Sequence, residues 1–276
     1  MLDNMTVKTK LLLLLITALV AAALIGGAGW MGLRATGHAI NEIGMVRLPS
    51  VQGLLVLSEG QTAVRSANRW VMTWENDYKA QSQFAEVLKA RKAAWDNLER
   101  GWKIYEPLPQ TEEEAVMWKQ LLKEFGDWKA GDQKISEVIE ALSRNNNEAE
   151  QKVLFAKYFA LAAENAANFT ASDATLNKIV DLNVKYGNEA VASGQAAEHQ
   201  ANLVMAGVGV AATIVLILLG TLIIRSILKQ LGGDPIYVSR VVGEIANGDL
   251  SVQVNLQPGD STSMLAAIGG MAEKLT

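Results

Sequence analysis

Two long, uncharged apolar stretches constrain this chain more than any other feature of its sequence. They cover residues 11–33 and 200–224 and are 23 and 25 residues long. At about 1.5 Å of rise per residue, a helix of either length reaches roughly 35 Å, which exceeds the hydrocarbon core of a bilayer, about 30 Å thick. The sequence therefore predicts two transmembrane helices that bracket a large polar segment, residues 34–199.

Basic residues beside the two stretches predict the orientation of the chain. Lys8 and Lys10 precede the first stretch, and Arg225 and Lys229 follow the second. Because Lys and Arg near a span resist translocation, residues 1–10 and the chain after the second stretch are expected in the cytoplasm. The segment between the spans is then periplasmic, in a multi-pass protein of a bacterial inner membrane. A cleaved signal peptide is the alternative, but its apolar core is typically only about 7 to 15 residues long.

Composition argues against several classes of function. A net charge of −4 gives no reason to expect nucleic acid as a partner. Because the chain has no cysteine, the exported segment must be held by packing, without disulfides or thiolate chemistry. The two histidines, His38 and His199, lie beside the apolar stretches, so no histidine metal site is expected. No nucleophile or phosphate-loop motif is present, and neither catalysis nor a cofactor is predicted.

The exported segment predicts helix almost throughout, because its apolar residues recur at spacings of three and four. Pro49 is expected to make an early irregularity in the first helix, which should run to about Trp74. Pro107-Leu108-Pro109 ends a second helix, and Thr111 with Glu114 forms a capping-box pattern that begins a third. Asn145-Asn146-Asn147 precedes a fourth helix that continues into the second span. This order is typical of an all-α, up-down-up-down four-helix bundle joined to two transmembrane helices.

Residues 225–276 predict a small module of two helices. Two apolar series step by three and four residues, as the a and d positions of a coiled coil do. Between them, a glycine turn precedes an alternating series that is typical of extended chain. In chain order, the three series are Pro235, Val238, Val242 and Ile245; Leu250, Val252, Val254 and Leu256; and Met264, Ile268, Met271 and Leu275.

This module resembles the HAMP linker of bacterial sensory receptors. The resemblance rests on Gly232-Gly233-Asp234-Pro235, Glu244 and Gly248-Asp249-Leu250, placed directly after an apolar span. The chain departs from the family at Asp260-Ser261-Thr262, where an acidic residue followed by glycine is usual. The resemblance implies a parallel coiled coil formed by a homodimer, and it implies that a helix displacement is relayed to the output. The residues that it assigns to this relay are Pro235, Glu244, Gly248 and Leu250.

The exported half is similar to the four-helix-bundle sensor of methyl-accepting chemotaxis proteins. Residues 64–69, Val-Arg-Ser-Ala-Asn-Arg, look like the arginine-bearing stretch of the amino-acid receptors of that family. In those relatives a ligand binds between the first helices of two subunits, and arginines hold its carboxylates. A further arginine of the family is replaced by Gly60 in this chain. This difference argues against aspartate or serine as the ligand, but it is compatible with another carboxylate.

Independently of the family, Arg65 and Arg69 point to a small anionic ligand held across a dimer interface. They share one helix face, and no acidic residue lies three or four positions from either. A like-charge pair at this spacing costs a few tenths of a kcal/mol, and the guanidinium fork suits a carboxylate. The alternatives are that Glu86 or Glu164 pairs with the arginines, or that both face water. Further candidates for the pocket are Asn68, Trp70, Tyr158, Phe159 and Asn165.

The combined prediction is a transmembrane chemoreceptor that binds a small carboxylate outside and changes the packing of its linker inside. Its expected partners are the lipid bilayer, a second copy of the chain in a homodimer or a higher array, and a cytoplasmic histidine kinase with its adaptor. Such receptors carry a kinase-control domain after the linker; here it is expected either beyond Thr276 in a longer chain or in a separate protein. Two alternatives stay open: the sensor portion of a membrane histidine kinase or cyclic-dinucleotide enzyme, and a scaffolding or adhesion protein without a ligand.

Overall fold

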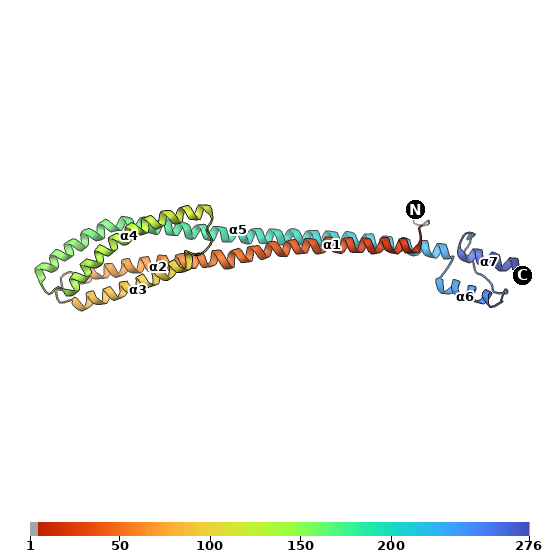
Figure 1. The fold of residues 1–276 in the computed structure, drawn as a ribbon, viewed down its shortest axis with the longest axis horizontal. Coiled ribbons are helices and arrows are strands. Elements are labelled where there is room, and N and C mark those ends of the chain that lie inside the picture. Colours follow the sequence, from red (N-terminus) through yellow and green to blue (C-terminus); the bar gives the residue numbers. More distant parts are fainter. Residues whose placement is uncertain (1–4, 276) are drawn as a thin grey trace. The chain divides into compact units, whose positions relative to one another are not determined.

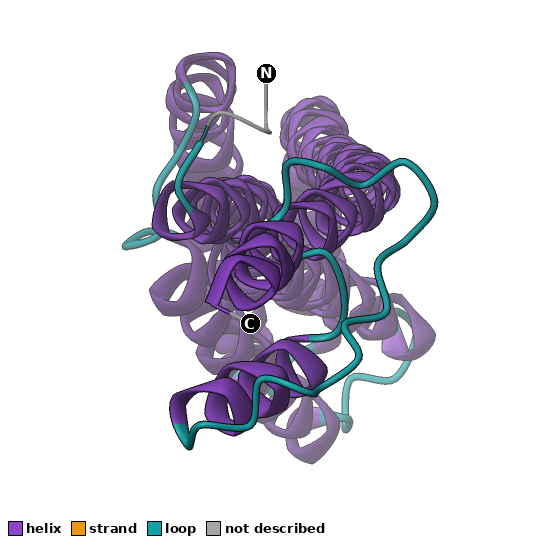
Figure 2. Ribbon diagram, turned by 90° about the vertical axis from the view of Figure 1, so that its right-hand side faces the viewer, coloured by secondary structure: helices purple, strands orange, loops and turns teal. Residues whose placement is uncertain are grey.

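A computed structural model describes residues 5–275 of the chain. The first four residues of the predicted cytoplasmic N-terminus and the last residue of the C-terminal module lie outside it. The described residues form helices joined by turns and loops, with no strand among them (Figure 2). They divide into two units, residues 35–196 and the rest of the chain. The prediction of an all-α protein is confirmed.

The unit of residues 35–196 is a four-helix bundle. It contains α2 (Leu48–Trp70), α3 (Gln81–Tyr105), α4 (Glu112–Arg144) and the first part of α5 (Glu148–Leu231). Within this unit the four helices run alongside one another and reverse direction at each connection (Figure 1). The bundle predicted from apolar spacing is therefore confirmed.

The predicted helix boundaries have clear local causes. At the start of α4, the Thr111 side chain accepts a hydrogen bond from the Glu114 backbone, and the Glu114 carboxylate accepts one from the Thr111 backbone. The α4 helix ends at Arg144, directly before the three asparagines. The α2 helix is followed by a 3₁₀ turn, Val71–Trp74, so the first helical run ends at the expected residue.

An irregular turn lies where Pro49 predicts one. The α1 helix (Val7–Asn41) continues through a π-helical turn, Glu42–Arg47, into α2, and Pro49 occupies the first turn of α2. Proline has no N–H to donate, so the hydrogen-bond ladder is interrupted at this point. The wider turn also aligns side chains that are five residues apart, and Arg47 Nε donates to Glu42 Oε1 at 2.7 Å.

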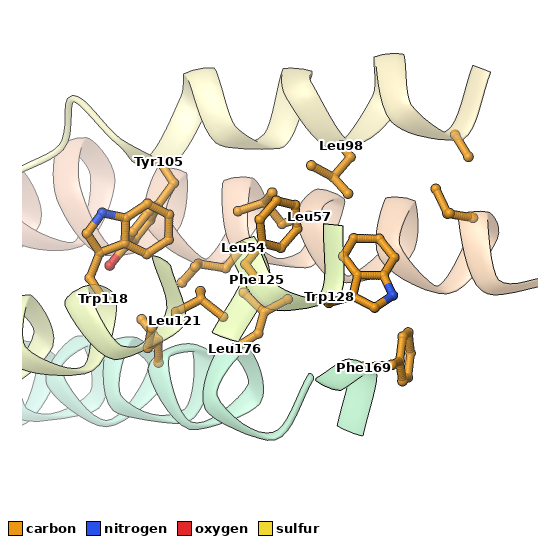
Figure 3. Packing of buried hydrophobic residues seen from close by; sticks show 13 residues of the cluster. Leu54, Leu57, Leu98, Tyr105, Trp118, Leu121, Phe125, Trp128, Phe169 and Leu176 are labelled. Carbon is orange, nitrogen blue, oxygen red and sulfur yellow. The ribbon is translucent and has the colours of Figure 1, made fainter. Parts of the chain in front are cut away.

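The bundle core consists of two buried apolar clusters. One centres on aromatic residues of α3 and α4, and Figure 3 shows Trp118, Phe125 and Trp128 between leucines of the neighbouring helices. The rings are in contact, with centroids 5.3 Å apart for Phe125 and Trp128 and 4.6 Å apart for Tyr105 and Trp118. Trp95 and Trp102 pack against the same cluster. Trp95, Trp102, Trp118 and Trp128 therefore serve core packing.

Glycines allow α2 and α3 to approach each other closely. A Cβ atom on Gly101 would lie 2.7 Å from the backbone oxygen of Gly53 and 2.7 Å from the backbone nitrogen of Leu57. A Cβ atom on Gly60 would lie 2.8 Å from the Cβ of Leu98. No larger residue fits at these positions at the present spacing of the helices, because real Cβ contacts are longer than this.

The second unit contains two helical segments that are long and apolar enough to cross a bilayer. They lie in α1 and α5 and include the predicted spans, 11–33 and 200–224. The two helices touch at Gly32, where an added Cβ would lie 2.5 Å from the Cβ of Ala201. Near the start of α1, Lys10 is fully buried and its Nζ donates to Ser226 Oγ at 2.9 Å.

The C-terminal module contains α6 (Pro235–Ala246) and α7 (Met264–Leu275), joined by an extended connector. Asp234 caps α6 by accepting from the Ile236 backbone, and Gly248 adopts a φ of +91° that favours glycine. Leu250 packs against the core of the module, as do Val252 and Val254. Leu256, the last member of the predicted alternating series, is exposed.

Of the predicted series in α7, Ile268 packs against the core of the module within the single chain, but the most deeply buried residues lie one position after Met264 and Met271. The side chain of Leu275, the last member of the series, lies outside the described residues. Leu265 and Ala272 are buried against α6, whereas Met264 and Met271 are about half exposed. The α6 face likewise uses Val241 in place of Val242. The first turn of α7 is capped: Ser263 Oγ accepts from the Ala266 backbone and donates to the Asp260 carboxylate.

Candidate ligand-binding site

Five of the seven predicted ligand residues line one small cavity. Arg65, Asn68 and Arg69 come from α2, and Tyr158 and Asn165 come from α5. The cavity has a volume of about 100 Å³. We call it the arginine cavity. Its wall is completed by Trp128, Ile135, Ala162, Ala166 and Phe169.

The other two predicted residues do not line this cavity. Trp70 is 44% exposed and lies against Trp74, with ring centroids 5.3 Å apart. Phe159 is 38% exposed and packs beside Tyr158 at 5.5 Å. Each follows a cavity residue by one position, and a helix turns about 100° per residue, so both side chains leave the cavity.

The two arginines have no carboxylate partner in the described part of the chain. The guanidinium carbon of Arg65 lies 4.2 Å from the ring centroid of Phe169, a cation–π contact. Glu86 pairs with Lys89 on its own helix, and Glu164 lines a neighbouring groove. The alternative that one of these acidic residues pairs with the arginines is therefore contradicted. Arg65 is partly buried, whereas Arg69 is exposed.

Hydrogen bonds fix the polar wall of the arginine cavity. The Tyr158 hydroxyl donates to the Asn68 carbonyl oxygen at 2.6 Å, and Asn165 Nδ2 donates to the Trp128 carbonyl oxygen at 3.0 Å. Burial raises the pKa of Tyr158 to about 12, although the nearby guanidinium groups of Arg91 and Arg69 oppose this shift. The hydroxyl is thus a neutral hydrogen-bond donor at physiological pH.

A buried ion pair lies behind the cavity, and sequence reasoning missed it. Arg91 Nη2 of α3 lies 2.7 Å from Asp132 Oδ2 of α4, and their side chains are only 4% and 1% exposed. Asp132 also accepts from Asn68 Nδ2 at 2.7 Å. A signal was present, because Arg91 follows Phe84 and Val87 at the spacing of the buried face of α3. A charged residue at such a position requires a buried partner.

A second buried polar cluster joins all four helices where α3 turns into α4. Glu114 is fully buried, and it accepts hydrogen bonds from Arg47 at 3.0 Å, from Tyr105 at 2.7 Å and from Asn183 at 2.7 Å. Arg47 Nη1 also donates to Asn183 Oδ1 at 3.0 Å. The capping-box pattern places Glu114 at a helix start, but its other partners could not be predicted from the sequence.

The site therefore combines a small volume, aromatic walls and two guanidinium groups without a counter-ion. Guanidinium groups form paired hydrogen bonds with carboxylates, and a partly buried cation near aromatic rings favours an anion over water. Chemically, the arrangement is suited to holding a small anion.

The four-helix bundle is a helical sensory module. The chain matches the model of the four helix bundle sensory module for signal transduction over residues 4–197. The match covers more than half of the chain, and the protein belongs to this family. No curated protein and no solved structure gave a significant match.

Proposed function

We propose that this protein is a transmembrane chemoreceptor that binds a small carboxylate, an amino acid or an organic acid, in the arginine cavity. One observation carries the proposal: Arg65 and Arg69 line the same cavity, and neither forms an ion pair in the described part of the chain. A bound carboxylate would supply the missing negative charge. Membership of the sensory-module family supports a role in signalling.

The size and lining of the cavity support a ligand of a few heavy atoms. A volume of about 100 Å³ accommodates a short carboxylate. The rings of Trp128, Tyr158 and Phe169 would contact its apolar part, and Asn165 adds an amide group. Apolar walls with a few polar anchors are the usual composition of small-molecule sites.

In this proposal the bundle is periplasmic and both ends of the chain are cytoplasmic. The basic residues Lys8, Lys10, Arg225 and Lys229 support that orientation in an inner membrane. A ligand shifts the balance between two arrangements of the bundle by its difference in affinity for them. The shift would reach the cytoplasm through α1 and α5, which run continuously out of the bundle as helices.

The C-terminal module would act as a HAMP linker in a homodimer. Met264 and Met271 are about half exposed, and a second copy of the chain would cover them. Pro235 starts α6, Gly248 makes the turn after it, and Leu250 packs on the module core. Asp249 donates a backbone hydrogen bond to the Glu244 carbonyl oxygen at 3.1 Å, which closes the same turn. The output partner in this proposal is a histidine kinase with its adaptor.

Calorimetric titration of the full chain in detergent tests the ligand assignment. The probes are acetate, succinate, L-alanine and benzoate, titrated into the unmodified protein and into Arg65→Ala. Saturable binding of at least one carboxylate is expected, with a Kd about tenfold higher or more in the variant, because a charge-assisted hydrogen bond contributes roughly 1.5 to 3 kcal/mol.

Arg100→Ala is the matched control for this titration. Arg100 is an exposed arginine of α3 that contacts Asn97 and does not line the cavity. Its replacement removes the same charge and is expected to leave the Kd unchanged. Equal binding by Arg65→Ala and the unmodified protein would refute the assignment.

A further inference from the structure

Arg91 and Asp132 contact the arginine cavity only through other residues. Neither side chain lines the cavity, and both are almost completely buried. Asp132 receives two hydrogen bonds from Arg91, at 2.7 and 3.2 Å, and one from Trp95 Nε1 at 3.2 Å. Arg91 Nη2 also donates to the Asp132 carbonyl oxygen at 3.3 Å, and the carboxylate accepts a 2.7 Å hydrogen bond from Asn68 Nδ2. The carboxylate therefore links α3 and α4 to a cavity residue of α2.

Asn68 is the point where this network reaches the cavity. Its side-chain nitrogen is held by Asp132, and its carbonyl oxygen accepts from Tyr158, which is another cavity residue. The network thus joins one layer of all four helices. Arg65 and Arg69 lie one turn before Asn68 and directly after it on the same helix, so a rotation of α2 at Asn68 would move both guanidinium groups.

We propose that Arg91 and Asp132 are positioning residues for the ligand site. They hold α2 in the rotation at which Arg65 and Arg69 both face the cavity, and they thereby set the affinity for a carboxylate. This inference rests on the proposed function. Charge-assisted hydrogen bonds are short and directional, so a buried pair of this kind fixes orientation more strictly than apolar packing does.

A purely structural role makes a different prediction. A buried ion pair can be replaced by apolar residues of similar volume without loss of stability, because the cost of desolvating both charges disappears with them. The double variant Arg91→Met with Asp132→Leu removes the network and leaves no unpaired charge. If the pair served packing alone, this variant would bind carboxylates as the unmodified protein does.

The chain offers a matched control in its second buried pair. Arg47 and Glu114 have side chains that are 7% and 0% exposed, and neither lines the arginine cavity. Arg47→Met with Glu114→Leu removes a second buried pair elsewhere in the bundle, together with the hydrogen bonds that Glu114 accepts from Tyr105, Asn183 and the Thr111 backbone. Any general effect of deleting a buried ion pair would appear in both double variants.

The test is calorimetric titration of the full chain with acetate and succinate, together with the thermal unfolding of each variant. We expect the Arg91 and Asp132 double variant to bind roughly tenfold more weakly, as loss of one oriented hydrogen bond in the site would cause. The Arg47 and Glu114 control is expected to bind within about twofold of the unmodified protein.

Four other outcomes are decisive against the inference. Unchanged binding in the Arg91 and Asp132 variant, together with weakened binding in Arg65→Ala, overturns the positioning role and leaves the proposed function in place. Equal weakening in the control overturns it too. No saturable binding of either probe by the unmodified chain overturns both. If the double variant does not fold, Asp132→Glu keeps the charge and displaces the carboxylate, so an unchanged Kd in it overturns the positioning role.

Discussion

Arg47 Nη1 lies 3.0 Å from Glu114 Oε2 and joins the π-helical turn before α2 to the first turn of α4. Both side chains are buried, and Glu114 is shared with Tyr105 and Asn183. The contact connects the turn between α1 and α2 to α4. Through Tyr105 it also involves α3, which is joined to α4 by the turn at Pro107 to Pro109. It is formed by residues 67 positions apart in the chain.

Replacing Glu114 by glutamine should destabilise the bundle strongly. The change leaves the Arg47 guanidinium buried without its carboxylate, and breaking one half of a buried pair typically costs about 3 to 5 kcal/mol. Thermal unfolding of the full chain in detergent, followed by circular dichroism, measures the loss. Glu112→Gln is the control, because Glu112 is exposed in the same helical turn. Equal melting of the two variants would show that the Arg47 contact does not stabilise the bundle.

Gly101→Ala should also destabilise the protein. The added methyl would lie 2.7 Å from two backbone atoms of α2, so the two helices must separate, and overpacking of this kind typically costs about 1 to 3 kcal/mol. Gly126→Ala in α4 is the opposite case, because nothing lies within 4 Å of its added methyl. That variant is expected to gain about 0.5 to 1 kcal/mol from helix propensity. Thermal unfolding distinguishes the two, and a stabilised Gly101→Ala would contradict the close approach of α2 and α3.

The buried phenol of Tyr158 predicts a loss of stability at high pH. Its pKa is raised from 10.0 to about 12 in the folded protein, chiefly by burial. The unfolded state therefore loses this proton first, and the stabilising contribution is complete below pH 10 and disappears as pH rises towards 12. Tyr105 acts in the same direction, because burial and the Glu114 carboxylate raise its pKa too.

Tyr158→Phe separates this contribution from the others. Unfolding free energies of the variant and the unmodified protein, measured from pH 9 to about pH 12, should converge as pH rises, because only the unmodified protein loses the Tyr158 contribution. At neutral pH the variant should be less stable by about 0.5 to 1.5 kcal/mol, the usual value of one hydrogen bond. Parallel profiles over the whole range would contradict the effect of burial on this group.

The buried faces of the helices could be predicted from the sequence, but the contacts between charged residues across the bundle could not. In α4, Trp118, Leu121, Phe125 and Trp128 recur at alternating steps of four and three, and all are buried. Local spacing is enough to identify such a face, because a helix turns 100° per residue whatever its neighbours are. The same periodicity extends to Glu114 and Asp132, but their partners lie on other helices. Which charges meet across the bundle depends on rotations that local spacing does not encode.

The candidate ligand residues likewise include some that the sequence could place and others that only the tertiary structure could place. The sequence placed Arg65 and Arg69 on one helix face without a local carboxylate, and that follows from spacing alone. Only the packed bundle brings Tyr158 and Asn165 to them and turns Trp70 and Phe159 away. A step of one residue changes direction by 100°, so choosing between neighbours such as Tyr158 and Phe159 requires the rotation of the whole helix.

The sequence by itself determined the helices, their ends, the two apolar spans and the four-helix class, because each depends on residues close together in the chain. The tertiary structure alone decided the Arg91 to Asp132 pair, the Glu114 cluster and the register of α7 against α6. The physical reason is that these contacts join residues that are distant in sequence. Their geometry is fixed by how the helices pack. That packing depends on side-chain volume, on the glycine contacts and on the buried charges.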